Sequence, residues 1–357
     1  MSASLLLARV CRARPGDLGR RCFACLPVSK GAQAAALSLV WCVNVVMAAP
    51  VGHQPTYLPI LGQYARGDGS LTVAERGDFV DPYFGNKALL IAWEGQLNVG
   101  ELTKSWLLWL LPRQRGDGGF DRFCLEAGHW RACKPADADD SSVATFLELS
   151  TIYQQHRRSV GLPESTPGLN EAQIAAKTLL MGLRQSDGIY RAFKDRPIAY
   201  LMDNTEVYAS LMVTGRKQAA ADLKQAVSKV FYRSGEWQPA NVEFDQRSFY
   251  PHALAPAYRW HTGFLSPAQV QSEFGAWARQ WGDAWLYRKQ DEYAWGLIGW
   301  GAREVDDQHW VRCWRFLHRS PSRARGWTVL DESVDLSLAH LGVEPVEASC
   351  ATLQLRR

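Results

Sequence analysis

Hydrophobic residues recur along most of the chain at the three- and four-residue spacing of helices that bury one face. Stretches that alternate between apolar and polar residues, as half-buried strands do, are scarce. The pattern predicts eleven helices, over residues 82–93, 98–111, 140–155, 170–185, 204–214, 217–231, 251–260, 267–281, 291–302, 306–318 and 331–341. Because the links are short and no low-complexity linker divides them, we expect a single all-α domain over residues 49–357.

Two predicted helices begin with residues that favour a helix N-terminus. Ser266 is followed by Pro267 and Gln269, which gives an N-cap, a proline in the first turn and a reciprocal capping partner. Asn170 and Gln173 have the same spacing of cap and partner. Both helices are therefore expected to start at these residues.

A weak internal repeat indicates how the helices are arranged. A glycine turn at residues 114–120 is followed by an acidic helix start at Asp137, and a second turn at 185–190 by one at Asp203. The turns lie 71 residues apart and the acids 66 residues apart. Repeated helical hairpins predict an (α/α)6 six-hairpin barrel, or toroid. Alternate helices then point their N-termini to one end, so both acidic starts are expected to face one funnel.

Residues 34–48 form an apolar stretch that follows Lys30 and ends in small residues that suit signal-peptidase cleavage after Ala48. The stretch is shorter than the roughly 20 apolar residues of a spanning helix. We expect residues 1–48 to be a leader with a signal peptide, and the protein to be periplasmic or secreted without a stable membrane span. An uncleaved membrane anchor and a buried helix are the alternatives.

The basic residues are concentrated in this leader. The whole chain has a formal charge of +4, and residues 1–48 hold six basic residues and one acid, which leaves 34 basic and 35 acidic residues in the rest. A chain without a basic excess has no electrostatic footprint for nucleic acid, so we expect no nucleic-acid partner.

Four of the eight cysteines follow the leader: Cys124, Cys133, Cys313 and Cys350. An even number in an exported protein is compatible with disulfides, and a bond between Cys124 and Cys133 would close a short loop. Free thiols are the alternative. The sequence has no CxxC, HxH or HExxH spacing, so we expect no metal and no cofactor.

The acidic segment at Asp137, Asp139 and Asp140 is the first candidate for chemistry. These residues lie at a predicted helix start, where one or two acids serve as cap and dipole partner. Three acids in four residues exceed what capping requires, so a functional role and a capping role both stand.

The second candidate is the helix start at Asp203 and Glu206, which also has the spacing of a capping box. The third is Glu94, which follows an apolar run and Trp93. A carboxyl group beside Trp93 in an apolar funnel would have a raised pKa, as a general acid requires. A solvated glutamate at a helix end is the alternative.

Aromatic residues make up 11% of the chain, including 15 Trp, which suggests an aromatic groove or aromatic helix packing. Trp130 lies in a loop before the acidic segment and is expected to stack on a substrate. Tyr83 and Tyr250 are candidates for lining the same groove. His252 follows a turn and could point into the funnel, although a lone histidine is more often structural.

Two segments resemble the active-site segments of family eight glycoside hydrolases, which belong to the six-hairpin glycosidase superfamily. Those enzymes carry a Ser-Glu-Gly-Gln segment with the catalytic acid, then an Ala-Ser-Asp-Ala-Asp segment that opens an inner helix. Residues 93–96 (Trp-Glu-Gly-Gln) and 136–139 (Ala-Asp-Ala-Asp) stand here in that order. Segments within residues 78–302 are also similar to a group of bacterial six-hairpin proteins. The resemblance implies a six-hairpin fold.

Residues 137–141 also resemble the Asp-x-Asp-Asp-Thr element of class II terpene cyclases, in which the middle aspartate protonates an alkene. Residues 114–120 resemble their Gln-to-Trp repeat. This resemblance implies a second toroidal fold with Asp139 as the acid, and it stays as a minor alternative.

These observations predict an exported carbohydrate-active enzyme, an inverting glycoside hydrolase that acts on a bacterial oligo- or polysaccharide. Glu94 is expected to protonate the leaving oxygen while Asp139 or Asp140 activates water, with the acids roughly 6.5–9.5 Å apart. Asp203 and Glu206 are expected to position sugar hydroxyls.

Further substrate contacts are expected from Asp137, Trp130, Tyr83, Tyr250 and His252. The alternative from a different class is a non-catalytic polysaccharide-binding or scaffold protein of the cell envelope. A polysaccharide lyase is a further alternative, and its chemistry would use Tyr250, His252 and Arg259.

Overall fold

The computed structural model describes residues 61–163, 166–244, 247–306, 309–318 and 326–355. The leader and the cleavage site expected within residues 1–48 lie outside the described residues. All elements named below belong to residues 55–357, which form one unit of chain contacts. Among the described helices, none is both long enough and apolar enough to cross a membrane.

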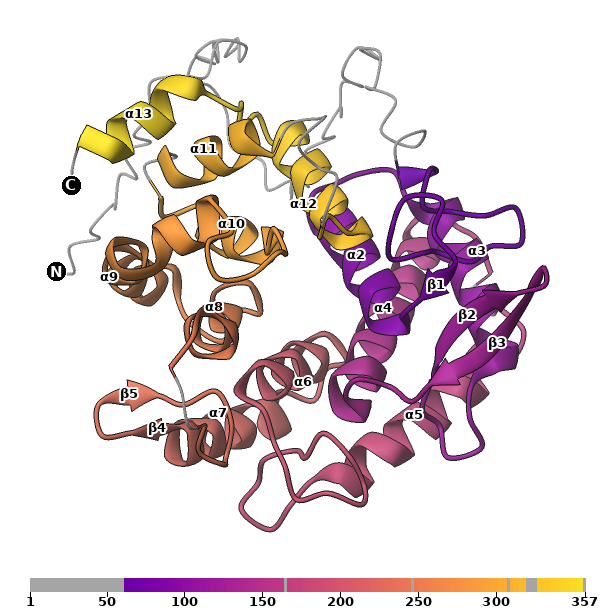
Figure 1. The fold of residues 1–357 in the computed structure, drawn as a ribbon. Helices are drawn as coiled ribbons and strands as arrows, with labels where there is room; N and C mark the ends of the chain where they lie inside the picture. Colours follow the sequence, from indigo (N-terminus) through magenta and orange to yellow (C-terminus); the bar gives the residue numbers. More distant parts are fainter. Residues whose placement is uncertain (1–60, 164–165, 245–246, 307–308, 319–325, 356–357) are drawn as a thin grey trace, which may run out of the picture. The chain divides into compact units, whose positions relative to one another are not determined.

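Helices dominate the described residues, as the hydrophobic pattern predicts (Figure 1). The α-helices are α2 (Pro82–Glu94), α3 (Gly100–Leu110), α4 (Asp139–Ser159), α5 (Leu169–Leu183), α6 (Leu201–Val213), α7 (Lys217–Phe231), α8 (Leu254–His261), α9 (Pro267–Leu286), α10 (Gly296–Ala302), α11 (His309–Leu317), α12 (Val329–His340) and α13 (Glu347–Leu355). The predicted all-α class is therefore confirmed.

Short strands make up the little sheet that the described residues contain. They are β1 (Phe79–Val80), β2 (Arg122–Glu126), β3 (His129–Lys134), β4 (Tyr232–Arg233) and β5 (Glu236–Trp237). β1, β2 and β3 pair in that order as an antiparallel sheet, and β4 pairs with β5. The β2–β3 hairpin was not predicted; β2 has three apolar residues in a row, Phe123, Cys124 and Leu125, and β3 alternates only over His129–Ala132.

Two disulfides join the four cysteines that follow the leader. Cys124 and Cys133 link β2 to β3 with their Cα atoms 5.7 Å apart, which is the pairing that the sequence suggested. Cys313 and Cys350 link α11 to α13. The first disulfide supports the hairpin from which Arg122 reaches the candidate site described below.

The two predicted helix starts have different outcomes. Ser266 and Gln269 form the expected capping box at the start of α9. The expectation for α5 is wrong, because Gly168, with a φ of +78°, begins this helix two residues earlier and leaves Asn170 inside its first turn. Asn170 accepts a hydrogen bond from Gln154 of α4 instead.

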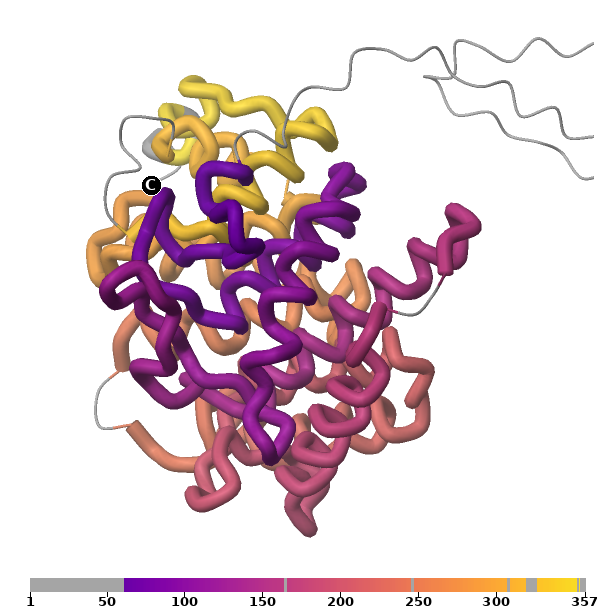
Figure 2. The backbone as a smooth tube through the Cα atoms, turned by 90° about the vertical axis from the view of Figure 1, so that its right-hand side faces the viewer, coloured from indigo at the N-terminus to yellow at the C-terminus, as the bar shows by residue number. Residues whose placement is uncertain are grey.

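The even-numbered helices pack on one another in sequence. α2 contacts α4, α4 contacts α6, and the series continues through α8, α10 and α12, which packs back against α2. In Figure 1 these helices lie inside, with α3, α5, α7 and α9 outside them. Figure 2 shows the same return: the first described segments, in indigo, lie beside the last helices, in yellow.

Burial separates the even-numbered helices from the others. Residues 139–150 of α4 are buried without interruption, as are residues 329–338 of α12. By contrast, α7 buries one stripe of residues and faces solvent with the rest. Helices that are covered on all sides contribute most of the apolar core.

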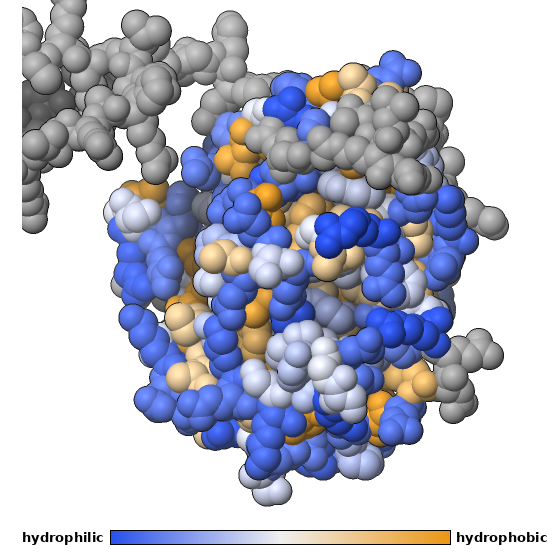
Figure 3. Space-filling view, turned by 90° about the vertical axis from the view of Figure 1, so that its left-hand side faces the viewer, coloured by the Kyte–Doolittle hydropathy of each residue, from blue (hydrophilic) through white to orange (hydrophobic). Residues whose placement is uncertain are grey.

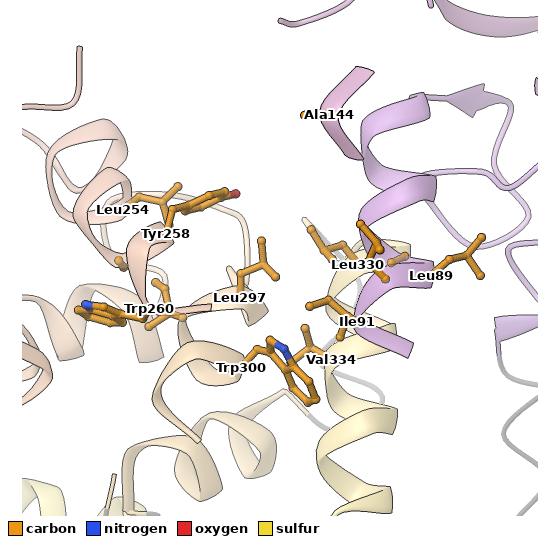
Figure 4. Close-up of a cluster of buried hydrophobic side chains, with 14 of the residues drawn as sticks. Leu89, Ile91, Ala144, Leu254, Tyr258, Trp260, Leu297, Trp300, Leu330 and Val334 are labelled. Atoms are coloured by element: carbon orange, nitrogen blue, oxygen red, sulfur yellow. The ribbon is translucent and has the colours of Figure 1, made fainter. Parts of the chain in front are cut away.

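Apolar side chains fill the space between the even-numbered helices. Figure 4 shows Ile91 of α2, Leu297 and Trp300 of α10, and Val334 of α12 pointing toward one another. All four are at most 2% exposed. On the outside, hydrophilic residues cover most of the face in Figure 3, and apolar residues show in smaller areas between them. The core therefore holds the N-terminal ends of these helices in fixed relation to one another.

Candidate active site

A pocket of about 570 Å³ opens at the N-terminal ends of the even-numbered helices. Each of α2, α4, α6, α8, α10 and α12 contributes residues to it, mostly from the first turn or the segment before it. The chain lines the pocket with Val73, Phe79, Asp81, Tyr83, Phe84, Arg122, Asp137, Ala138, Ser141, Ser142, Tyr200, Met202, Asp203, Tyr250, Tyr258, Asp291, Tyr293, Trp295, Gly296, Leu297, Thr328, Leu330 and Asp331. The two acidic helix starts, at Asp137 and Asp203, meet here as the repeat predicted.

Asp203 and Asp140 form a pair of neighbouring carboxyl groups from α6 and α4. Burial, followed by the charge of Asp140, raises the pKa of Asp203 well above its ordinary value. Asp140 is fully buried, and burial raises its pKa to about 7. Since two adjacent carboxylates in a poorly solvated site repel each other, the pair keeps a proton at neutral pH. Asp203 lines the pocket, and its Oδ2 atom finds no hydrogen-bond partner among the described residues.

Asp81, Arg122 and Asp137 form a charged wall of the pocket. Asp81 is the N-cap of α2 and accepts a hydrogen bond from the backbone N–H of Tyr83 at 3.0 Å. Burial raises the pKa of Asp81 to about 6. One Nη atom of Arg122 lies 3.9 Å from the Asp81 carboxylate and 3.5 Å from that of Asp137. The side chain of Asp137 is 79% exposed, so its carboxylate is open to water and to a ligand.

The acidic segment 137–140 therefore divides into three environments. Asp137 faces the pocket, and Asp140 is buried beside Asp203. Asp139 does not line the pocket; its carboxylate accepts a hydrogen bond from Arg115 at 2.7 Å. A salt bridge to Arg115 satisfies Asp139 where it stands, so it is not positioned to activate water in this pocket.

Aromatic rings form an apolar surface in the same pocket as the charged side chains. The rings of Tyr250 and Trp295 stack with centroids 5.7 Å apart and planes 6° from parallel, and Tyr293 lies 5.5 Å from Trp295. Trp295 is the residue before α10 and has a φ of +49°, a left-handed conformation that costs a non-glycine residue free energy. A flat aromatic surface beside carboxylates suits a ligand with apolar faces and hydroxyl edges, as sugars have.

A buried charged group lies beneath this surface. Tyr83 lines the pocket, and its hydroxyl donates to Glu206 at 2.9 Å. Lys87 lies 3.3 Å from the same carboxylate, and both charged side chains are at most 3% exposed. Glu206 was expected to contact substrate, but it is 1% exposed and does not line the pocket itself.

Three residues predicted for the site lie elsewhere. Glu94 is the last residue of α2, one helix length of about 20 Å from the pocket end, and it accepts a hydrogen bond from Trp300 at 2.7 Å. Trp130 donates to Asp68 and packs against Trp109. His252 accepts a hydrogen bond from the backbone N–H of Ser248. The structure does not bring Glu94, Trp130 or His252 together with Asp203.

Several lining residues were not singled out from the sequence. Asp81 had a usable signal, because an aspartate before Pro82 is a strong helix-start pattern. Arg122, at the start of β2, and Asp291, before α10, had none, since single charged residues outside a motif are ordinary. Within the described residues, there is no group of three or more His, Cys, Asp or Glu residues that could hold a metal ion.

No protein-family model matches the chain, and no significant match is found among curated proteins. Solved structures do match. A glycosidase in complex with glucose is 14% identical, with a TM-score of 0.54, over 81% of this chain and 96% of the other. An alpha-amylase from Clostridium perfringens is 10% identical, with a TM-score of 0.54 and the same coverage. A D-mannose isomerase is 10% identical, with a TM-score of 0.53, over 80% of this chain and 95% of the other.

The fold is that of glycosidase-like helical proteins. The resemblance predicted from the sequence is thereby confirmed at the level of the fold. The presence of an isomerase among these neighbours leaves the reaction open.

Proposed function

We propose that this protein is a carbohydrate-active enzyme, a glycoside hydrolase with a six-hairpin (α/α)6 barrel. The observation that carries the proposal is Asp203, a carboxyl group whose pKa is raised well above its ordinary value by burial and by Asp140, in a pocket lined by carboxylates and aromatic rings. A protonated carboxyl group of this kind is what a glycosidase needs as its general acid. The cyclic packing of the even-numbered helices supports the barrel arrangement.

The proposed reaction inverts the anomeric carbon. Asp203 gives its proton to the leaving glycosidic oxygen as the bond to the anomeric carbon breaks. Asp137, exposed and ionised beside Arg122, takes a proton from a water molecule, whose oxygen bonds to the same carbon. After the product leaves, Asp137 releases to solvent the proton that it took from water, and Asp203, which lines the pocket, takes a proton from solvent, so that the starting state is restored. In this proposal Asp203 and Asp137 take the acid and base roles that the sequence suggested for Glu94 and for Asp139 or Asp140.

The other functions suggested by the sequence find less support in the pocket. A lyase would use Tyr250, His252 and Arg259, but only Tyr250 lines the pocket; Arg259 is bound to Glu273 at 2.6 Å. The middle aspartate of the cyclase-like element, Asp139, is paired with Arg115. A non-catalytic binding protein would not need a proton-holding carboxyl pair in its pocket.

We also propose that the protein is exported, with residues 34–48 as the apolar part of a signal peptide. The two disulfides support an oxidising compartment, since such bonds are rare in the cytosol. A bacterial polysaccharide outside the cytoplasm is then the substrate class.

The direct test is proton NMR of the protein incubated with a panel of neutral and amino-sugar oligosaccharides. We expect new reducing ends that first appear in the anomeric form opposite to that of the cleaved bond. Release of the same anomer would overturn the inverting mechanism. Conversion of a free aldose into a ketose would identify an isomerase, and binding without any product would identify a binding protein.

The stacked pair at the pocket predicts a chain-length effect. Tyr250→Ala removes a ring that is 48% exposed and stacked on Trp295, so it takes away contact area for one sugar ring. We expect KM to rise roughly tenfold for long oligosaccharides, about 1.4 kcal/mol, with kcat within about twofold. Steady-state kinetics against chain length measure this.

Tyr232→Ala is the matched control for Tyr250→Ala. Tyr232 is 49% exposed and packs on Trp237, but it does not line the pocket. We expect its kinetics to match those of the unchanged protein. An equal rise in KM for both variants would show that Tyr250 has no specific role in binding.

A further inference from the structure

A buried ion pair between Lys87 and Glu206 lies directly behind the pocket. The two side chains come from α2 and α6, their charged atoms are 3.3 Å apart, and they are 3% and 1% exposed. Burying two charges costs several kcal/mol of solvation free energy, and replacing such a pair with apolar residues is often neutral or stabilising. Stability alone is therefore a weak reason for this pair to exist.

The ion pair is connected to the pocket through two groups. The Tyr83 hydroxyl donates its proton to Glu206 at 2.9 Å, so its oxygen can offer only lone pairs to a ligand. Asp203 lies three residues before Glu206 on α6, so the two carboxyl groups lie on one face of the helix. The pair thus touches a pocket wall and lies next to the acid proposed for the reaction.

We propose that Lys87 and Glu206 are positioning residues for the active site: Glu206 fixes the Tyr83 hydroxyl and places a permanent negative charge one helical turn below Asp203. The inference rests on the proposed function, because that function makes Asp203 the general acid. The effect of Glu206 on the titration of Asp203 can nevertheless be measured without any substrate. Lys87 is needed because it keeps Glu206 ionised although both side chains are buried away from solvent.

The neighbouring groups leave Lys87 as the cation for Glu206. Burial raises the pKa of Glu148 to about 8, so this acid is protonated at neutral pH. Burial lowers the pKa of His261 to about 4, so this ring is neutral. The titratable groups that face Glu206 come from four helices: Tyr83 and Lys87 of α2, Asp140 and Glu148 of α4, Asp203 of α6, and Tyr258 and His261 of α8.

The negative charge of Glu206 shifts the pKa values of Asp140 and Asp203 in the same direction. It raises the pKa of Asp140 and of Asp203, in addition to the larger effect of burial on both. Removing this charge should therefore lower both values, because ionisation of the acid pair would then meet less repulsion.

The test is the double variant Lys87→Met/Glu206→Gln, in which no buried charge is left unpaired and Gln can still accept from Tyr83. Carbon-13 NMR of aspartate carboxyl groups follows their titration, and the spectrum of Asp203→Asn identifies the Asp203 signal. We expect the titration midpoint of Asp203 to fall by about one pH unit. The alkaline limb of kcat should shift by the same amount if the protein is a hydrolase.

The matched control is Arg315→Met/Asp335→Asn, which removes another buried pair, with 2.6 Å between its charged atoms, away from the pocket. We expect the Asp203 titration to stay unchanged there. An unchanged midpoint in Lys87→Met/Glu206→Gln overturns the inference, whether or not the protein cleaves sugars. A shifted midpoint in a protein without hydrolase activity supports the inference and overturns the proposed function.

Discussion

Asp203→Asn is expected to lower kcat by a factor of about 10³, with KM changed less than threefold. The amide has nearly the shape of the acid, but it has no proton to give to the leaving oxygen. General acid catalysis contributes roughly 10²–10⁴ to the rate of such reactions. The measurement is steady-state kinetics on the best oligosaccharide, together with an aryl glycoside whose leaving group is a weak base. The aryl glycoside needs no proton, so its kcat should fall less than tenfold.

The pH dependence of kcat follows from the raised pKa values. Asp203 and Asp140 hold a proton below their pKa values, and Asp140 loses its own near pH 7. As pH rises through this range and above it, the protonated acid is lost, so kcat should fall on the alkaline side. Asp203→Asn should abolish this alkaline limb, since its residual activity no longer depends on that proton.

Glu94→Gln is the control for Asp203→Asn. Glutamine keeps an oxygen that can accept from Trp300, so this end of α2 should stay intact. We expect kcat within about twofold of the unchanged protein. The opposite result would overturn the assignment of the acid: a fall in kcat of about 10³ in Glu94→Gln, with the activity of Asp203→Asn unchanged.

The part of this site that the sequence could predict is the part encoded by helix starts. A repeated helix, turn and acidic start predicts that Asp137 and Asp203 share one end of the molecule, and both line the pocket. The direction of each helix follows from the order of turn and acidic start along the chain, so a repeated sequence pattern is enough to predict it. The same reasoning recovered the all-α class from the spacing of apolar residues.

The roles within the acidic segment could not be predicted, because they depend on partners far away in the chain. Asp139 and Asp140 are adjacent, yet one is paired with Arg115 and the other is buried beside Asp203. Glu94 has the local sequence of a catalytic acid but occupies the wrong end of its helix for this pocket. Its role was inferred from the neighbouring Trp93, whereas its carboxylate accepts a hydrogen bond from Trp300, more than 200 residues later in the chain.

The single variant Lys87→Met is expected to lose about 3–5 kcal/mol of unfolding free energy at pH 8. It leaves Glu206 as a buried charge without its cation, and breaking a buried pair in this way is strongly destabilising. Urea unfolding, followed by circular dichroism, measures the loss. The double variant Lys87→Met/Glu206→Gln should regain most of the lost unfolding free energy, because no unpaired charge is then left in the core.

The loss in Lys87→Met should shrink as the pH falls. In the unchanged protein burial acts to raise the pKa of Glu206, but the charge of Lys87 is the largest opposing effect, and the pKa is lowered overall. Ionised Glu206 therefore stabilises the fold above the unfolded pKa of 4.5, and this stabilisation is lost as the pH falls below it. Without Lys87, burial raises this pKa instead. Glu206 then gains a proton on folding, so the variant is least stable at high pH and recovers toward pH 5.

This pH trend separates a stranded charge from a packing defect. Met has nearly the length of the Lys side chain, so a defect in shape alone would cost the same free energy at pH 8 and at pH 5. A constant loss across this range would therefore mean that Glu206 is not held ionised by Lys87. A loss that declines by about 2 kcal/mol or more between pH 8 and pH 5 would show that Lys87 on α2 keeps Glu206 ionised. The charge that Glu206 exerts on Asp203 would then depend on this one lysine.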